Sequence, residues 1–262
     1  EAVVDGDLRF TYGEFLERCD RWSSALQALG VQQGDRVAYI APNTHSHLEG
    51  YYAVPQIGAV LVPINYRLQP GDFEYIINHC GAKVICVHPD YIPAIDEIRA
   101  NLPSGETFVA LEGSGQGWIE YESTLQSHSP AFTTVEINES DLITINYTSG
   151  TTARPKGVMI THRNAYINIM GTLVHHHLTV GDRYLWTLPM FHANGWTFPW
   201  INTARGMAHV CLRKVEPALI FQLIKEENIT MFCAAPTVLI SIANAPEELR
   251  ADAPRGGRLL TA

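Results

Sequence analysis

The sequence lacks the features that mark several classes of protein. Lys and Arg total 18 against 27 Asp and Glu, and this net charge of -9 argues against a general nucleic-acid binder. No apolar run approaches the roughly 20 residues that a membrane-spanning helix needs. The five cysteines are scattered and odd in number, and none forms a CxxC pair. They predict buried, reduced thiols in a cytoplasmic protein.

The two ends of the sequence also lack familiar signals. The first residue is not Met, and no basic segment followed by an apolar one is present, so we expect no signal peptide. Residues 258–262 begin a buried-strand pattern and then stop. A domain rarely ends on a half-built strand, so we expect these 262 residues to be a fragment of a longer protein.

Short apolar runs alternate with amphipathic stretches along the chain. The apolar runs predict strands at 36–41, 59–64, 82–88, 107–111, 142–147, 157–160, 183–188, 208–212, 230–234 and 258–262. A first helix is predicted between a capping box at Thr11 and Glu14 and an end at Gly30. A second is predicted at 46–57, with Pro55 at its end. Further helices are predicted at 72–80, 92–101, near 118–125, and at 161–178, 217–227 and 236–245. Continuous apolar strands between helices predict an α/β fold of layered sheets with helices on both faces.

The most informative segment is YTSGTTARPKGV at 147–158, which follows a predicted buried strand. Hydroxyl groups, glycines and cations are concentrated in it, at Thr148, Ser149, Thr151, Thr152, Gly150, Gly157, Arg154 and Lys156. Hydroxyl groups donate hydrogen bonds to phosphate oxygens, glycines permit close backbone approach, and the cations supply positive charge. The segment therefore predicts a phosphate-binding loop, which an acidic chain needs in order to bind an anion such as ATP.

A Walker A loop is the nearest alternative for this segment. Gly150 and Lys156 have the required Gly-to-Lys spacing. Pro155 stands at the position of the second glycine, however, and Gly157 at the position of the Ser or Thr that binds Mg²⁺. A strand rather than a helix is expected to follow, so we reject the Walker A interpretation.

The string YTSGTTARPKGV closely resembles the phosphate-binding signature of the adenylate-forming (AMP-binding) superfamily, YTSGTTGxPKG. Acyl-CoA synthetases, firefly luciferase and the adenylation domains of peptide synthetases belong to this superfamily. The sequence departs from the signature at Ala153, where the family has Gly, and the effect of that change is not predicted. The resemblance implies that Thr148, Ser149, Gly150, Thr151, Thr152 and Lys156 bind ATP, and that Thr152 and Lys156 serve catalysis.

A second segment, LPMFHANGW at 188–196, resembles the aromatic/His motif of the same family and is most like its fatty-acyl-CoA synthetase branch. The resemblance implies that His192 is catalytic and lies beside the acyl-adenylate, with Gly195 and Trp196 at the acid. Trp196 is either a gate for the alkyl chain or a core residue, whereas Phe198 and Trp200 are expected in the core. Thr237, in a segment that resembles a helix start of the substrate cleft, is a further candidate for contact with the acid.

The sequence also contains histidines that are candidate metal ligands. His175, His176 and His177 are adjacent on a predicted helix, so their side chains point about 100° apart and cannot share one ion. His45 and His47 are interpreted as surface or capping residues. We predict no metal ligand in this chain.

The resemblance implies an ATP-dependent carboxylic acid–CoA ligase that forms an acyl-adenylate, with ATP, Mg²⁺ and coenzyme A as ligands and a fatty acid as the leading substrate. An aryl or short-acid ligase, or a fatty-acyl-AMP ligase, is the alternative within this chemistry. A non-catalytic nucleotide-binding module is the alternative outside it. A fatty substrate is compatible with peripheral membrane contact, and the oligomeric state is not predicted.

The resemblance also implies a domain organisation. Residues 1–262 would form part of the large N-terminal domain, with one subdomain at 37–172 and a second made of 1–36 plus 173–262. The small C-terminal domain and the acidic Mg²⁺ ligand would lie outside this chain. The fragment alone is therefore expected to have little or no ligase activity.

Overall fold

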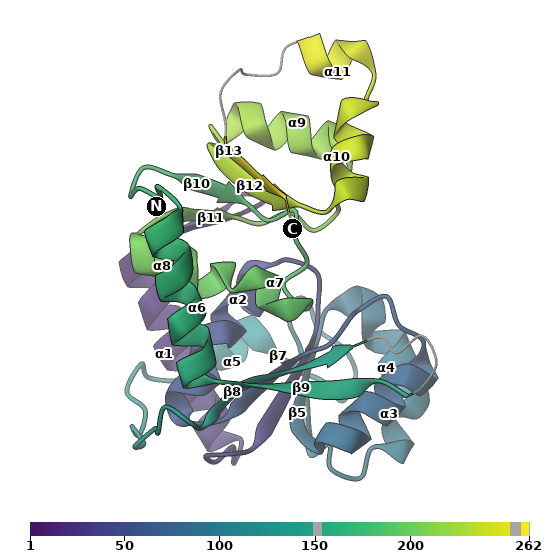
Figure 1. Ribbon diagram of the computed structural model, residues 1–262. Helices are drawn as coiled ribbons and strands as arrows, with labels where there is room; N and C mark the ends of the chain where they lie inside the picture. Colours follow the sequence, from purple (N-terminus) through teal and green to yellow (C-terminus); the bar gives the residue numbers. More distant parts are fainter. Residues whose placement is uncertain (149–153, 252–257, 262) are drawn as a thin grey trace.

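The computed structural model describes residues 1–148, 154–251 and 258–261. Two β-sheets lie one above the other in Figure 1, with helices between them and outside them. The larger sheet has the strand order β7-β6-β5-β3-β4-β8-β9, and the smaller has the order β13-β12-β10-β11-β1-β2. Neighbouring strands are parallel, except for the antiparallel pairs β8–β9 and β1–β2.

The strands are short. Those of the larger sheet are β3 (Arg36–Ile40), β4 (Val60–Pro63), β5 (Ala82–Val87), β6 (Thr107–Ala110), β7 (Ile119–Glu120), β8 (Leu142–Thr148) and β9 (Lys156–Thr161). Those of the smaller sheet are β1 (Val3–Asp5), β2 (Leu8–Phe10), β10 (Arg183–Leu185), β11 (Ala208–Val210), β12 (Met231–Ala234) and β13 (Arg258–Thr261). The larger sheet thus comes from one continuous stretch of chain and the smaller from both ends. The subdomain boundaries expected from the resemblance remain a prediction.

Helices fill three layers around the two sheets (Figure 1). The helices of the middle layer are α1 (Tyr12–Ala28), α2 (His45–Ala53), α5 (Tyr121–Ser127), α6 (His162–His175) and α8 (Phe198–Arg205). The outer face of the larger sheet carries α3 (Pro70–Cys80) and α4 (Ile92–Ile98), and the smaller sheet carries α9 (Pro217–Glu226), α10 (Pro236–Ala243) and α11 (Glu247–Ala251). Short 3₁₀ turns lie at Pro55–Ile57, Pro89–Tyr91 and Arg99–Asn101.

The side chains of β3 show that helices cover both faces of the larger sheet. Val37 and Tyr39 are fully buried in the core shared with α1 and α2, whereas Ala38 and Ile40 are fully buried in the core shared with α3 and α4. Successive side chains of a strand point to opposite faces, so a strand buried on both sides must be continuously apolar. The predicted α/β fold of layered sheets with helices on both faces is confirmed.

Local signals placed several helix ends correctly. The capping box of α1 is present, because the Thr11 side chain accepts from the backbone N–H of Glu14 while the Glu14 carboxylate accepts from the backbone N–H of Thr11. Helix α2 ends at Ala53, just before Pro55 starts a 3₁₀ turn. Helix α6 begins after the cap Thr161, as predicted, but ends at His175 rather than near 178. Strands β1, β2 and β7 and helices α8 and α11 were not predicted, and the residues of β7 lie at the start of the helix predicted near 118–125.

The interpretation of His45 and His47 as surface or capping residues was wrong. Both are buried, with 2% and 0% of their surface exposed. Thr44 provides the cap instead, because its hydroxyl accepts from the backbone N–H of His47 at 3.3 Å. The His47 ring stacks between Tyr39 and Tyr51, and burial lowers its pKa to about 4, so it is neutral.

His45, at the start of α2, connects β1 of the smaller sheet to α5 through a buried ion pair. Its Nδ1 lies 2.7 Å from the carboxylate of Asp5 on β1, and its Nε2 lies 3.2 Å from the carboxylate of Glu122 on α5. Burial disfavours the charged ring, but these hydrogen bonds outweigh it and raise the pKa of His45 to about 10. Burial also opposes ionisation of Asp5 and Glu122, yet hydrogen bonds from His45 and from arginines lower both pKa values to about 2.

This cluster predicts how the free energy of unfolding depends on pH. The stabilisation from His45 is complete below its ordinary pKa of 6.5 and is lost as the pH rises through about 10. The stabilisation from Asp5 is complete above its ordinary pKa of 3.8 and is lost as the pH falls through about 2. In urea unfolding, the free energies of unfolding of wild type and His45→Gln should therefore differ most between pH 3.8 and pH 6.5, where both contributions are complete. A stability difference that stayed constant from pH 6 to pH 10 would contradict a charged His45.

Candidate functional site

The predicted phosphate-binding loop connects two antiparallel strands. Thr148 ends β8 and Lys156 begins β9, and the two residues face each other in the ladder. The Thr148 hydroxyl donates to the backbone carbonyl of Lys156 at 3.5 Å, and both side chains are otherwise exposed. A strand rather than a helix follows the loop, which confirms the rejection of a Walker A motif. Ser149, Gly150, Thr151, Thr152 and Ala153 lie outside the described residues.

Gly157 is required by close packing rather than by a turn. It lies inside β9 opposite Tyr147. A Cβ atom at this position would lie 2.8 Å from a methyl carbon of Ile145 and 3.3 Å from the Tyr147 ring. Only glycine lets β9 approach β8 so closely here.

Helix α3 holds the two described ends of the loop. The Tyr75 hydroxyl donates to the backbone carbonyl of Pro155 at 3.2 Å, and the Arg154 guanidinium lies 5.2 Å from the centre of the Tyr75 ring. On the entry side, the Tyr147 hydroxyl lies 2.6 Å from Nδ1 of His79. The residues just before and just after the loop are therefore both held by side chains of α3.

A pocket of about 350 Å³ opens beside the loop. Its walls come from the ends of β8 and β9, from one face of α6, and from the segment after β10 that contains His192. Among the residues described around it, none is Asp, Glu, Lys or Arg, and the polar groups are amides, hydroxyls and one imidazole. Thr148, His192 and Trp196 all line this pocket, so three of the predicted site residues converge on it.

His192 and Trp196 are partly open to solvent at this pocket. His192 is exposed and directly precedes α7 (Ala193–Trp196). Trp196 is 43% exposed, whereas Phe198 and Trp200 are 1% and 9% exposed. The prediction that Phe198 and Trp200 belong to the core is confirmed. Trp196 is a wall of the pocket and not a buried core residue, and its role as a gate remains a prediction.

The α7 segment is a left-handed turn. Five consecutive residues have positive φ, from 46° at Ala193 through 54°, 52° and 57° to 64° at Thr197. The left-handed conformation costs about 1–2 kcal/mol for each residue other than glycine, so such a run persists only where its surroundings hold it. Strained backbone of this kind is concentrated at functional sites.

Gly195 and Thr237 do not join the pocket wall. Gly195 is buried behind it, where an added Cβ atom would overlap the ring of Trp186. Gly195 therefore shapes the turn instead of contacting a ligand in this pocket. Thr237 is exposed at the start of α10 and is not among the residues that line the pocket. Their assignment to the acid site remains a prediction.

Several residues of the pocket were not predicted, notably Asn146 on β8, Asn168 on α6 and Asn194 in the turn. A signal for Asn146 was present in the sequence. In the buried run LITINY, Thr144 and Asn146 are polar residues two positions apart, and therefore lie on the same face of the strand. Buried polar residues need partners, so this pair pointed to a polar contact at that face.

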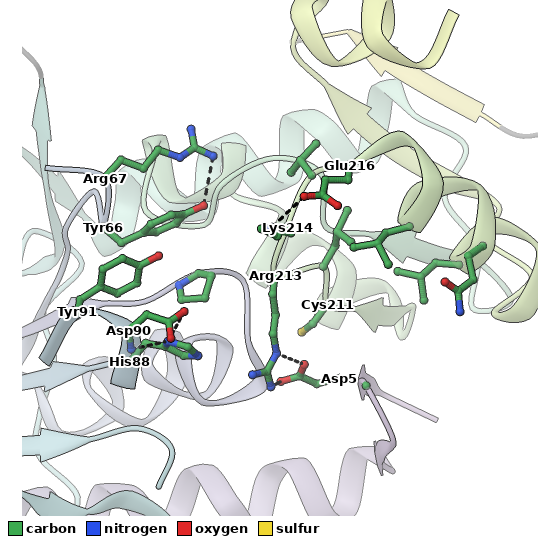
Figure 2. Close-up of a pocket in the computed structure, with 17 residues that line it drawn as sticks. Asp5, Tyr66, Arg67, His88, Asp90, Tyr91, Cys211, Arg213, Lys214 and Glu216 are labelled. Carbon is green, nitrogen blue, oxygen red and sulfur yellow. Dashed lines mark hydrogen bonds and ion pairs between the residues drawn. The ribbon is translucent and has the colours of Figure 1, made fainter. Parts of the chain in front are cut away.

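A second pocket, of about 760 Å³, lies between the two sheets (Figure 2). The rings of Tyr66 and Tyr91 lie 5.2 Å apart at one side of it, and the Arg67 guanidinium lies over the Tyr66 ring. On the opposite side, Arg213 pairs with the Asp5 carboxylate at 3.1 Å. The Tyr66 ring also packs edge-on against Phe191, the residue before His192, so the two pockets are neighbours.

Clusters of potential metal ligands and membrane-spanning helices were both searched for among the described residues. No group of three or more His, Cys, Asp or Glu side chains in residues 1–148, 154–251 and 258–261 could hold a metal ion. Within the same ranges, no helix combines the length and the apolar character that crossing a membrane requires.

Comparison with known proteins gives consistent results. The model of the AMP-binding enzyme family matches residues 1–261. The chain is 38% identical over 256 residues to 4-hydroxybutyrate–CoA ligase 2 of Metallosphaera sedula, covering 93% of this chain and 46% of the relative. It is 36% identical over 267 residues to the peroxisomal acetate/butyrate–CoA ligase AAE7 of Arabidopsis thaliana, covering 95% and 47%.

Solved structures match in the same way. An inhibitor-bound N-terminal domain of FACL13 from Mycobacterium tuberculosis superposes with a TM-score of 0.90 at 30% identity, covering 99% of this chain and 65% of that one. The anthranilate CoA ligase AuaEII with anthranoyl-AMP superposes with a TM-score of 0.85 at 26% identity, covering 92% and 47%. The chain spans about half the length of the curated relatives it matches.

Proposed function

Because this chain belongs to the AMP-binding enzyme family, we propose that the complete protein is an ATP-dependent ligase that joins a carboxylic acid to coenzyme A. One observation carries the proposal. Thr148, at the mouth of the phosphate-binding loop, lines the same pocket as His192 and Trp196. A nucleotide phosphate held by the loop would therefore lie next to an acid held in the pocket, which is the juxtaposition that adenylation needs.

The reaction has two steps. In the first, a carboxylate oxygen attacks the α-phosphorus of ATP, the bond to the bridging oxygen breaks, and pyrophosphate leaves. A carboxylate is already a nucleophile at neutral pH, so this step needs alignment and charge neutralisation rather than a general base. In the second, the thiol of coenzyme A attacks the acyl carbonyl, loses its proton, and displaces AMP.

The residues of this chain would bind and orient the reactants. Thr148 and Lys156, at the two ends of the loop, would hold the β- and γ-phosphates together with the hydroxyls of 149–152. His192 would lie against the acyl-adenylate, where the imidazole ring can form a hydrogen bond with it. Mg²⁺ would neutralise phosphate charge in such a reaction. The described residues contain no group of three or more His, Cys, Asp or Glu side chains that could hold an ion, and we derive no step through it.

The pocket and the relatives bear on the identity of the acid. The pocket walls carry no formal charge among the described residues, which favours an acid with an uncharged alkyl or aryl group. The FHANGW string favours a fatty acid. The names of the two curated relatives refer instead to 4-hydroxybutyrate and to acetate and butyrate, and the liganded neighbour holds anthranoyl-AMP. We retain a fatty acid as the leading proposal, with short and aryl acids as the alternative.

Trp196→Ala tests whether this side chain limits the length of the acid. The ring is 43% exposed at the pocket, so its removal should enlarge the pocket at little cost in stability. We expect kcat/KM in acid-dependent exchange to rise or fall about tenfold for some chain lengths relative to others. The measurement is a kinetic series from acetate to palmitate in the complete protein. An unchanged profile would remove the gate hypothesis.

The second pocket is our proposed site for the nucleotide part of coenzyme A. Its paired tyrosines offer a stacking surface, and the exposed Arg67 offers a cation for phosphate. Because the Tyr66 ring contacts Phe191, this site would lie beside His192, and a thiol on a flexible arm would have a short path to the acyl group. A cytoplasmic location also remains a proposal, because AAE7 is named as peroxisomal.

Arg67→Ala tests this placement. The KM for coenzyme A should rise about tenfold, as expected for the loss of one charge-assisted hydrogen bond. Acid-dependent exchange of pyrophosphate into ATP should not change, because that half-reaction does not use coenzyme A. Lys225, an exposed cation on α9 that does not line the pocket, serves as the control when changed to Ala. An unaltered KM for coenzyme A in the Arg67 variant would contradict the assignment.

A further inference from the structure

The side chains of Thr144, Asn146 and Asn194 form a closed ring of hydrogen bonds at the wall of the pocket, which Asn146 and Asn194 line. Asn146 Nδ2 donates to Asn194 Oδ1 at 2.8 Å, and Asn194 Nδ2 donates to Thr144 Oγ1 at 2.9 Å. Thr144 Oγ1 completes the ring by donating to Asn146 Oδ1 at 3.0 Å. The three residues are 0%, 7% and 2% exposed, so each bond is shielded from water.

The ring joins two segments that are far apart in the sequence. Thr144 and Asn146 lie on one face of β8, the strand that leads to the phosphate-binding loop. Asn194 lies in the left-handed turn between His192 and Trp196, with φ 54° and ψ 42°. Asparagine tolerates this backbone conformation better than most residues, and its short amide reaches β8.

The other end of the turn is tied to a different element. The Thr197 hydroxyl donates to the side-chain carbonyl of Asn168 on α6. The turn is therefore fixed at Asn194 to the larger sheet and at Thr197 to the helix. Trp196 lies between these two attachments, and His192 lies just before the first.

We propose that this ring is a positioning device for the adenylation reaction, with Asn194 as its central residue. Because the same strand carries the ring and then enters the phosphate-binding loop, the ring sets the position of His192 and Trp196 relative to the ATP phosphates. The ring residues act through their neighbours rather than on the reacting atoms. The role in adenylation rests on the proposed function, whereas the role of the ring in anchoring the left-handed turn does not.

Thr144 offers a matched pair of variants. Thr144→Val keeps the shape but removes the hydroxyl that donates one ring bond and accepts another. Thr144→Ser keeps the hydroxyl but removes a methyl group from a fully buried site, and so carries its own cost in stability. Asn194→Gly is a third variant, because glycine adopts the left-handed backbone without strain while losing both side-chain bonds.

Two measurements on the complete protein test the proposal. In acid-dependent pyrophosphate exchange, Thr144→Val and Asn194→Gly should lose at least about tenfold in kcat/KM for the acid, with the KM for ATP within about twofold of wild type. Thr144→Ser should keep most of the activity. Losses of equal size in the Val and Ser variants would show a merely structural role and overturn the proposal.

Amide hydrogen exchange supplies a readout that does not depend on activity. Residues 192–197 should exchange faster in Thr144→Val and Asn194→Gly than in wild type, and at the wild-type rate in Thr144→Ser. Unchanged protection of this segment in all three variants would overturn the ring as its anchor. If wild-type protein shows no exchange activity with any acid, the proposed function fails, and the protection data alone decide whether the ring holds the turn.

Discussion

Replacing Gly195 with alanine is expected to lower the free energy of unfolding by about 2–4 kcal/mol, because it combines backbone strain with overpacking. Gly195 has φ 52°, a conformation that a Cβ atom disfavours. An added Cβ would also overlap the ring of Trp186, which is fully buried. The Trp186 ring packs against the rings of Tyr184 and His209, so we expect the left-handed turn to shift instead. Urea unfolding of the complete protein measures this loss.

Gly171 provides a matched control for the same substitution. It lies within helix α6, has an ordinary backbone conformation, and an added Cβ would meet nothing within 4 Å. Gly171→Ala should therefore leave stability unchanged or raise it by about 0.5–1 kcal/mol through helix propensity. If Gly195→Ala and Gly171→Ala had similar stabilities, the packing described for the turn would be wrong. The Gly195 variant should also lose acid-dependent exchange, because a shift of the turn would displace both His192 and Trp196.

The second large effect is expected at Glu49, whose surface is fully buried in α2. Its Oε1 lies 2.5 Å from Nε of Arg18, and its Oε2 accepts from the Tyr121 hydroxyl at 2.5 Å. Removing one partner of a buried ion pair leaves the other charge poorly compensated. Arg18 would keep its pair with Glu122 at 2.5 Å, so we expect Glu49→Ala to cost about 3 kcal/mol, at the low end for such pairs.

A neighbouring ion pair on α1 is the control for this change. Glu17 pairs with Arg21 at 2.7 Å, four residues apart on the helix, and its side chain is 53% exposed. Exposed pairs of this type contribute roughly 0.3–0.5 kcal/mol. Glu17→Ala should therefore be nearly neutral in urea unfolding. A loss at Glu49 no larger than the loss at Glu17 would contradict the view that the buried network holds α1, α2 and α5 together.

The sequence carried enough information for most of the sheet and helix order. Strands buried on both faces are continuously apolar, as in RVAYI of β3, and such runs are visible without a structure. Strands β1 and β2 were missed, although Gly6 and Asp7 between them form a typical hairpin turn signal. The left-handed turn was not predictable, because only one of its five residues is glycine.

The site was predictable where a motif concentrates the relevant residues along the chain. Thr148, His192 and Trp196 lie in two such strings, and the structure brings them to one pocket. The buried role of His45 could not be read locally, because its partner Asp5 lies 40 residues away. The same holds for Asn146 and Asn194, which are 48 residues apart. Contacts between distant segments depend on how the two sheets stack, and a local pattern does not encode that.

The most direct test of the central claim is ATP–pyrophosphate exchange by the complete protein that contains this chain. The assay would use acids from acetate to palmitate and a few aryl acids, with wild type beside Lys156→Ala. We expect exchange that depends on particular acids and falls at least about tenfold in the Lys156 variant, because its charge would meet the ATP phosphates. Weak ATP binding without exchange, from folded protein and with every acid, would contradict the ligase and favour a non-catalytic nucleotide-binding module.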